Sequence, residues 1–126
     1  MNDQISRAFN DWADRILSEH PIEVAAYNFN LYEHGHAFAI QLIGSTRFDS
    51  DDSSWACDEL FSSGEDLFEI PHEVVGSDWQ DGLAAAKQLI MNYARSGKQC
   101  AKLTSTQGVG VGFVDGDIDL ILVGGK

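Results

Sequence analysis

Basic residues are scarce in this 126-residue sequence, which has eight Lys and Arg against 20 Asp and Glu. The formal net charge is therefore −12 at pH 7. A surface of this sign repels phosphate backbones and anionic lipid, so it argues against a protein that binds nucleic acids or membrane surfaces. The same surface favours a basic protein partner, because a long-range field speeds the encounter of opposite charges.

Cysteines and long hydrophobic runs are also scarce. Two cysteines, Cys57 and Cys100, are too few for a disulfide framework, and we expect both to be reduced thiols. No stretch approaches the roughly 18 apolar residues of a membrane span, and aspartates interrupt the region where a signal peptide needs an apolar run. The sequence predicts a cytoplasmic protein that folds as a single domain over residues 1–126.

Apolar periodicity predicts two helices. Apolar side chains recur at three- and four-residue steps over residues 5–17 and again over residues 83–93. His20-Pro21 is placed to end the first helix, because the residue before a proline disfavours helical angles. The second helix opens with SDWQ at residues 77–80, which has the form of a capping box, and Gly97 is placed to end it.

Alternation of apolar and polar residues predicts two hairpins. The first covers residues 25–43, with Gly35 in its turn, and the second covers residues 108–122, with Asp115-Gly116 in its turn. We therefore predict an α+β fold in which two helices pack against an antiparallel sheet made of the two hairpins.

The segment between Arg47 and Lys87 separates the two halves of the chain. It holds 39 positions without any Lys or Arg, and 11 of the 20 acidic residues lie there. Large apolar residues alternate with the acids, so we predict an ordered acidic excursion and not a disordered tail. Its expected elements are a short helix over residues 54–61 and an edge strand over residues 67–70.

Two motifs resemble metal sites without matching one. The run from Asp49 to Ser53 starts like a calcium loop, but Ser54 and Leu60 occupy the positions that require Gly and Glu. His34 and His36 have no structural zinc spacing and would need a further ligand from elsewhere in the chain.

Catalytic and phosphate-binding motifs are weaker still. Cys57 has no local partner that would activate a thiol nucleophile. Gly108, Gly110 and Gly112 lack the spacing of a dinucleotide fingerprint, and they indicate close packing of another group against a strand. The sequence therefore predicts no catalytic residue, no cofactor and no metal, and the protein is not expected to be an enzyme.

Three stretches give the sequence a family resemblance: YNFNLYE at residues 27–33, STRFDSDDSSWACDELF at residues 45–61, and GVGVGFVDGDIDLI at residues 108–121. With its size and charge, the sequence resembles the small acidic immunity proteins of bacterial toxin–immunity systems, including contact-dependent inhibition. The resemblance implies a cytoplasmic protein that binds one cognate toxin domain, often a nuclease, and blocks its active site or substrate surface.

The acidic excursion is the predicted partner-binding site. A rim of carboxylates around an aromatic anchor suits a basic cleft on another protein, because the acids orient the partner and the desolvated anchor slows its dissociation. Trp55 is the predicted anchor. The predicted rim consists of Asp49, Asp51, Asp52, Asp58, Glu59, Glu65 and Asp66.

Several alternatives stay open. A DNA-mimic inhibitor would use the spaced carboxylates to imitate phosphates, and a small enzyme or metal-binding protein would use His34 and His36. The excursion also fits a solvated loop that keeps the protein soluble. The polar strand face of Asn28, Asn30 and Tyr32 is a second candidate interface.

Overall fold

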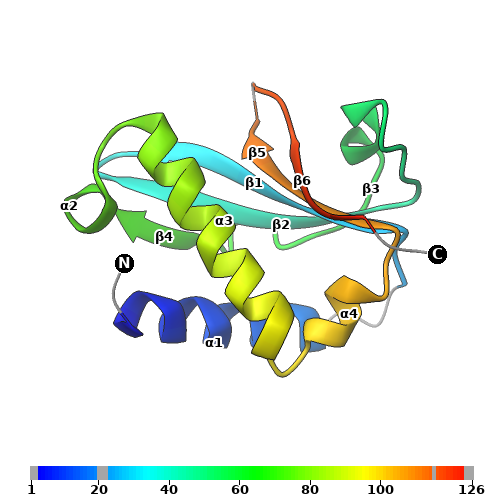
Figure 1. Ribbon diagram of the computed structural model, residues 1–126, viewed down its shortest axis with the longest axis horizontal. Coiled ribbons are helices and arrows are strands. Elements are labelled where there is room, and N and C mark those ends of the chain that lie inside the picture. The colour runs from blue at the N-terminus through cyan, green and yellow to red at the C-terminus, as the bar shows by residue number, and fades with distance from the viewer. Residues whose placement is uncertain (1–2, 20–22, 115, 124–126) are drawn as a thin grey trace.

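The computed structural model describes residues 3–19, 23–114 and 116–123, and it is an α+β fold of helices packed on a six-stranded sheet (Figure 1). Figure 1 shows α1, α3 and α4 on the same side of the sheet. The elements in chain order are α1 (Asp3–Glu19), β1 (Ala26–His34), β2 (Ala37–Ser45), the 3₁₀-helix η1 (Ser53–Cys57), β3 (Glu59–Ser62), β4 (Phe68–Pro71), α2 (His72–Val75), α3 (Trp79–Ser96), α4 (Cys100–Thr104), β5 (Gly108–Phe113) and β6 (Asp119–Val123).

The sheet is mostly antiparallel. Its strand order is β3-β2-β1-β5-β6, and β4 pairs with β2 on the same edge as β3. Both predicted hairpins are present, as β1 with β2 and β5 with β6. The α+β class is confirmed, but the predicted arrangement is incomplete. β1 and β5 join the hairpins as a parallel pair, and the described residues hold two further short α-helices, a 3₁₀-helix and two further strands.

Alternation along β1 separates the face of the sheet that carries α1, α3 and α4 from the opposite face (Figure 1). Tyr27, Phe29 and Leu31 are buried in the core with the helices, whereas Asn28 and Asn30 point to the opposite face. Gly35 takes the positive φ of 66° that the predicted turn between β1 and β2 requires.

The core lies between the helices and the sheet. Phe9 of α1 meets Phe68 of β4 edge-on with ring centroids 5.3 Å apart, and it lies 6.1 Å from Phe29. Leu89 and Ile90 of α3 are also fully buried in this cluster. Burial of each large apolar side chain contributes about 1.5–3 kcal/mol, so these contacts fix both long helices against the sheet.

The acidic excursion is ordered, as predicted, but one of its elements differs. The sequence predicts a helix over residues 54–61, whereas the structure has η1 over residues 53–57 and then strand β3. The strand forms because the edge of β2 offers backbone hydrogen-bond partners to Phe61 and Ser62. The predicted edge strand is confirmed as β4, which pairs with the first half of β2.

The predicted capping box at residues 77–80 is wrong. The helix α3 begins one residue later, with Asp78 as its N-cap, and the Asp78 side chain makes no capping hydrogen bond. Asp78 has extended backbone angles and its carbonyl accepts the first helical hydrogen bond from Gly82, which removes Ser77 from the cap position. Gly97 ends α3 as predicted, although its φ of −68° is not left-handed.

The predicted helix stop at His20-Pro21 and the predicted turn at Asp115-Gly116 involve residues outside the described ranges. Cys57 and Cys100 are free. No helix within the described ranges has the length and apolar character needed to cross a membrane.

Candidate functional site

The predicted acidic rim is divided, because several of its carboxylates bind groups within the chain. Arg47 donates to the Asp58 carboxylate through Nε and to Ser54 Oγ through Nη2, the latter at 3.0 Å. Asp52 Oδ1 accepts a hydrogen bond of 3.0 Å from the Ser54 amide and so caps η1. This hydrogen bond lowers the pKa of Asp52 below its ordinary value. These contacts hold the loop between β2 and β3.

Asp66 lies away from that loop, against α1. Both terminal nitrogens of Arg15 donate to its carboxylate, and Trp12 Nε1 donates to its carbonyl oxygen at 3.2 Å. The hydrogen bond from the Arg15 guanidinium holds the pKa of Asp66 below its ordinary value. Asp66 therefore ties the β3–β4 connection to the first helix.

The other predicted carboxylates are exposed. Asp49 Oδ1 accepts a local hydrogen bond of 2.9 Å from the Asp51 amide, which shapes the start of the loop. Asp51, Glu59 and Glu65 are exposed on the same excursion. These carboxylates contribute to the long-range field, but no aromatic ring between residues 48 and 71 is exposed for them to surround.

Trp55 is not the exposed anchor that the sequence predicts, because only 1% of it is exposed. Its ring meets that of Phe48 with centroids 5.1 Å apart, over the glycines of β5. A Cβ at Gly108 would overlap the Phe48 ring. One at Gly110 would overlap Ile118 and Asn28 and would be in ordinary contact with Trp55 Cζ2, at 3.5 Å. The predicted close packing against these glycines is confirmed. The Phe48 ring fills the space at Gly108, and Trp55 is buried against that ring. Ser45 Oγ also donates to the Trp55 carbonyl at 2.5 Å.

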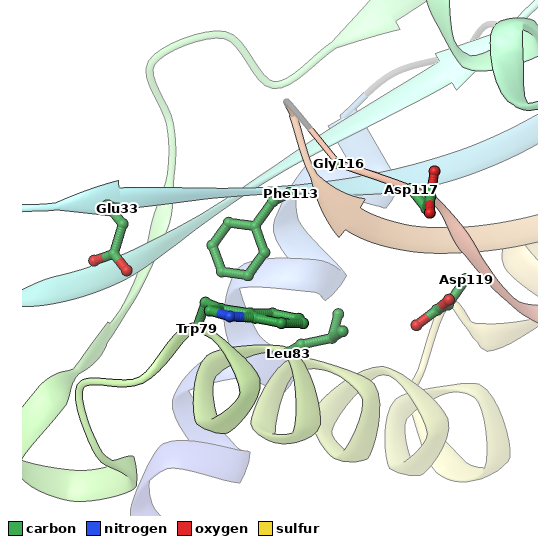
Figure 2. Close-up of a pocket in the computed structure, with 7 residues that line it drawn as sticks. All are labelled: Glu33, Trp79, Leu83, Phe113, Gly116, Asp117 and Asp119. Atoms are coloured by element: carbon green, nitrogen blue, oxygen red, sulfur yellow. The ribbon is translucent and has the colours of Figure 1, made fainter.

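An exposed aromatic side chain does line a cleft elsewhere, between α3 and the β5–β6 hairpin (Figure 2). The cleft has a volume of about 550 Å³. Trp79, the first residue of α3, is 53% exposed and meets Phe113 edge-on, with ring centroids 6.4 Å apart. Leu83 lies one helical turn further along and contributes to the apolar lining. We call this feature the Trp79 cleft.

Three carboxylates from separate segments rim the Trp79 cleft. Glu33 stands near the end of β1, Asp117 in the loop before β6, and Asp119 at the start of β6. Figure 2 shows Glu33 on one side of the aromatic pair and the two aspartates on the other. Lys87 Nζ lies 2.8 Å from Asp119 Oδ2. Three carboxylates and one ammonium leave the rim with a formal charge of −2.

The apolar part of this cleft could be predicted from the sequence, but its carboxylates could not. Trp79 stands four residues before Leu83, so it extends the apolar stripe of α3 by one turn at the helix end. The carboxylates could not be assigned to it, because parallel pairing of β1 with β5 places Leu31 opposite Phe113 and so brings Glu33 to the hairpin. No local sequence pattern encodes that pairing.

The polar strand face forms a hydrogen-bonded ladder. Asn28 Nδ2 donates to Asn30 Oδ1 at 2.7 Å, and Asn30 Nδ2 donates to Gln41 Oε1 at 3.2 Å. Tyr32 OH donates to the same Gln41 oxygen at 2.8 Å, and Gln41 Nε2 donates to the Gly64 carbonyl at 2.9 Å. Among the described residues no group donates to Asn28 Oδ1, which is buried. These groups bond mainly to one another, which leaves few of them for a partner.

Histidines near the β1–β2 turn lie beside carboxylates. His34 Nδ1 is 2.6 Å from Glu69 Oε2, and His72 Nε2 is 3.3 Å from Glu33 Oε1. Over residues 3–19, 23–114 and 116–123, no group of three His, Cys, Asp or Glu side chains is arranged to hold a metal ion. The geometry therefore adds no support to a metal site built on His34 and His36.

Comparisons of the chain with protein-family models, curated proteins and solved structures find no match. The function is consequently argued from the geometry and charge of the site, since a fold class alone does not define an activity.

Proposed function

We propose that this protein binds and neutralises a basic protein in a stoichiometric complex in the cytoplasm, as the small acidic immunity proteins that it resembles do. The observation that carries the proposal is the Trp79 cleft, in which a half-exposed indole is rimmed by carboxylates. Large aromatic side chains are the usual anchors of protein interfaces. The net charge of −12 selects for a partner of opposite sign.

In this mechanism, one part of the surface attracts the partner and another part holds it in the complex. Exposed carboxylates such as Asp51, Glu59 and Glu65 add to the field that accelerates association. Trp79 loses its contact with water in the complex, which slows dissociation. Neutralisation follows when the bound chain covers the active site or the substrate surface of the partner.

The contacts within the excursion favour one cognate partner over imitation of DNA. A DNA mimic displays evenly spaced, free negative groups to many phosphate-binding proteins. In this chain Asp58 and Asp66 are paired with arginines, and Asp52 caps η1. The remaining charge is accordingly less regular than a phosphate backbone.

Capture and inhibition test this proposal. We expect the immobilised protein to retain one basic protein, in equal molar amount, from a low-salt lysate of its host and to release it in a salt step. The released protein is expected to lose its activity when the chain is added back at a 1:1 ratio. A triple variant with Asp51→Asn, Glu59→Gln and Glu65→Gln is expected to associate more slowly at low salt, because part of the steering field is removed.

Two outcomes would argue against the proposal. Capture of many unrelated nucleic-acid-binding proteins would favour DNA mimicry. A captured protein that keeps its full activity in the 1:1 complex would show binding without neutralisation.

A further inference from the structure

We propose that the Trp79 cleft takes an arginine side chain of the basic partner, with the guanidinium against the indole and between the carboxylates on either side. The identity of the partner rests on the proposed function. The preference of the cleft for arginine does not, so it can be tested with a peptide probe alone.

The cleft combines the two kinds of group that recognise a guanidinium. Trp is the best of the aromatic side chains for binding a cation over its ring, within about 6 Å of the ring centroid. The Trp79 indole is 53% exposed, and its edge-on contact with Phe113 supports it from one side. Glu33 on one side and Asp117 on the other provide oxygen atoms that accept the charged N–H groups (Figure 2).

Lys87 already places one cation at this rim. Its ammonium lies 2.8 Å from Asp119, and both side chains are close to half exposed, at 40% and 45%. An exposed ion pair of this kind is weak, so an incoming cation can displace it at little cost. Lys87 therefore competes with the partner's arginine for Asp119, and this competition lowers the affinity of the cleft for arginine.

The shape and lining of the cleft favour arginine over lysine. A guanidinium is planar, stacks on aromatic faces and is less strongly hydrated than an ammonium, so it loses less on entering an aromatic cleft. The volume of about 550 Å³ admits the side chain together with part of the flanking backbone. It also lies within the range of about 300–1,000 Å³ that is typical of ligand sites.

A pair of peptides tests the inference, namely hexa-arginine and hexa-lysine, which match in length and charge. We expect hexa-arginine to bind at least about threefold more tightly, as a cation–π contact predicts. It should shift the NMR signal of the Trp79 indole N–H. The buried Trp12 and Trp55, which are 5% and 1% exposed, serve as internal references whose signals stay in place.

Variants separate the cleft from general charge attraction. Trp79→Ala is expected to abolish the preference for arginine. Lys87→Gln is expected to strengthen hexa-arginine binding about two- to fivefold, because it frees Asp119, and structural damage could not produce such a gain. The control, Glu59→Gln with Glu65→Gln, should weaken both peptides equally and keep the preference. Equal binding of the two peptides, or an unchanged preference in Trp79→Ala, would overturn the inference.

Failure of the proposed function would look different. In that case wild-type protein would still prefer hexa-arginine, but no basic protein would be inhibited by it. If the inference alone were wrong, the two peptides would bind equally, while the wild-type protein would still inhibit its partner and Trp79→Ala would still weaken that complex.

Discussion

At the scale of single residues, two tryptophans show how surroundings decide a role. Trp55 lies in the most acidic part of the sequence, yet its ring is 1% exposed and packs against Phe48 over the glycines of β5. Trp79 belongs to the apolar stripe of a helix, yet it is 53% exposed beside three carboxylates. We therefore expect Trp55 to contribute to stability, and we propose Trp79, the exposed ring, as the residue that binds a partner.

Truncation of each tryptophan tests this division. We expect Trp55→Ala to lower the free energy of unfolding by about 3–5 kcal/mol, because it leaves a cavity under the excursion. Trp79→Ala should cost about 1 kcal/mol or less, since much of the ring is in water already. Urea denaturation of both variants measures the difference. Equal losses would contradict the assignment of the two residues.

At the scale of elements, the glycines of β5 allow close packing at both ends of the strand. Gly108 makes room for the ring of Phe48, and Gly110 makes room for Ile118 and Asn28, because a Cβ at either glycine would overlap these groups. Gly112 lets the loop before β6 approach the strand, because a Cβ there would overlap the carbonyl oxygen of Asp117. The glycines thus position the aspartates of the Trp79 cleft as well as the buried end of the excursion.

A methyl group at Gly112 tests the second of these contacts. We expect Gly112→Ala to destabilise the fold by about 1–3 kcal/mol and to weaken hexa-arginine binding, because the loop must move away with Asp117. Thermal unfolding and peptide titration measure the two effects. Gly116→Ala is the stability control, since its Cβ would meet only ordinary contacts at 3.7 Å and beyond. Unchanged stability in Gly112→Ala would show that the loop adapts freely.

Local periodicity was sufficient to predict the main elements. The apolar stripe of α1 and the alternation along β1 and β2 follow from neighbouring residues, so their positions could be read from the sequence. The parallel pairing of β1 with β5 and the burial of Trp55 depend on residues far apart in the chain, and no local pattern specifies them.

At the scale of the whole molecule, the sequence shows the sign of the charge but not its distribution. Arg15 and Asp66 are 51 positions apart, and their pairing removes one predicted carboxylate from the surface set. Glu33 and Asp119 lie 46 and 40 positions from Trp79 in the sequence, yet all three line the same cleft. The predicted principle of acids around a Trp is therefore found in the fold, at a different tryptophan.

The central claim is that Trp79 anchors a basic partner, and the dissociation constant of the captured partner tests it most directly. We expect Trp79→Ala to raise this constant about tenfold or more, mainly through faster dissociation. Met91→Ala is the matched control, because Met91 is 40% exposed on the same helix but does not line the cleft. It should bind like the wild type. Equal dissociation constants for all three proteins would contradict the claim.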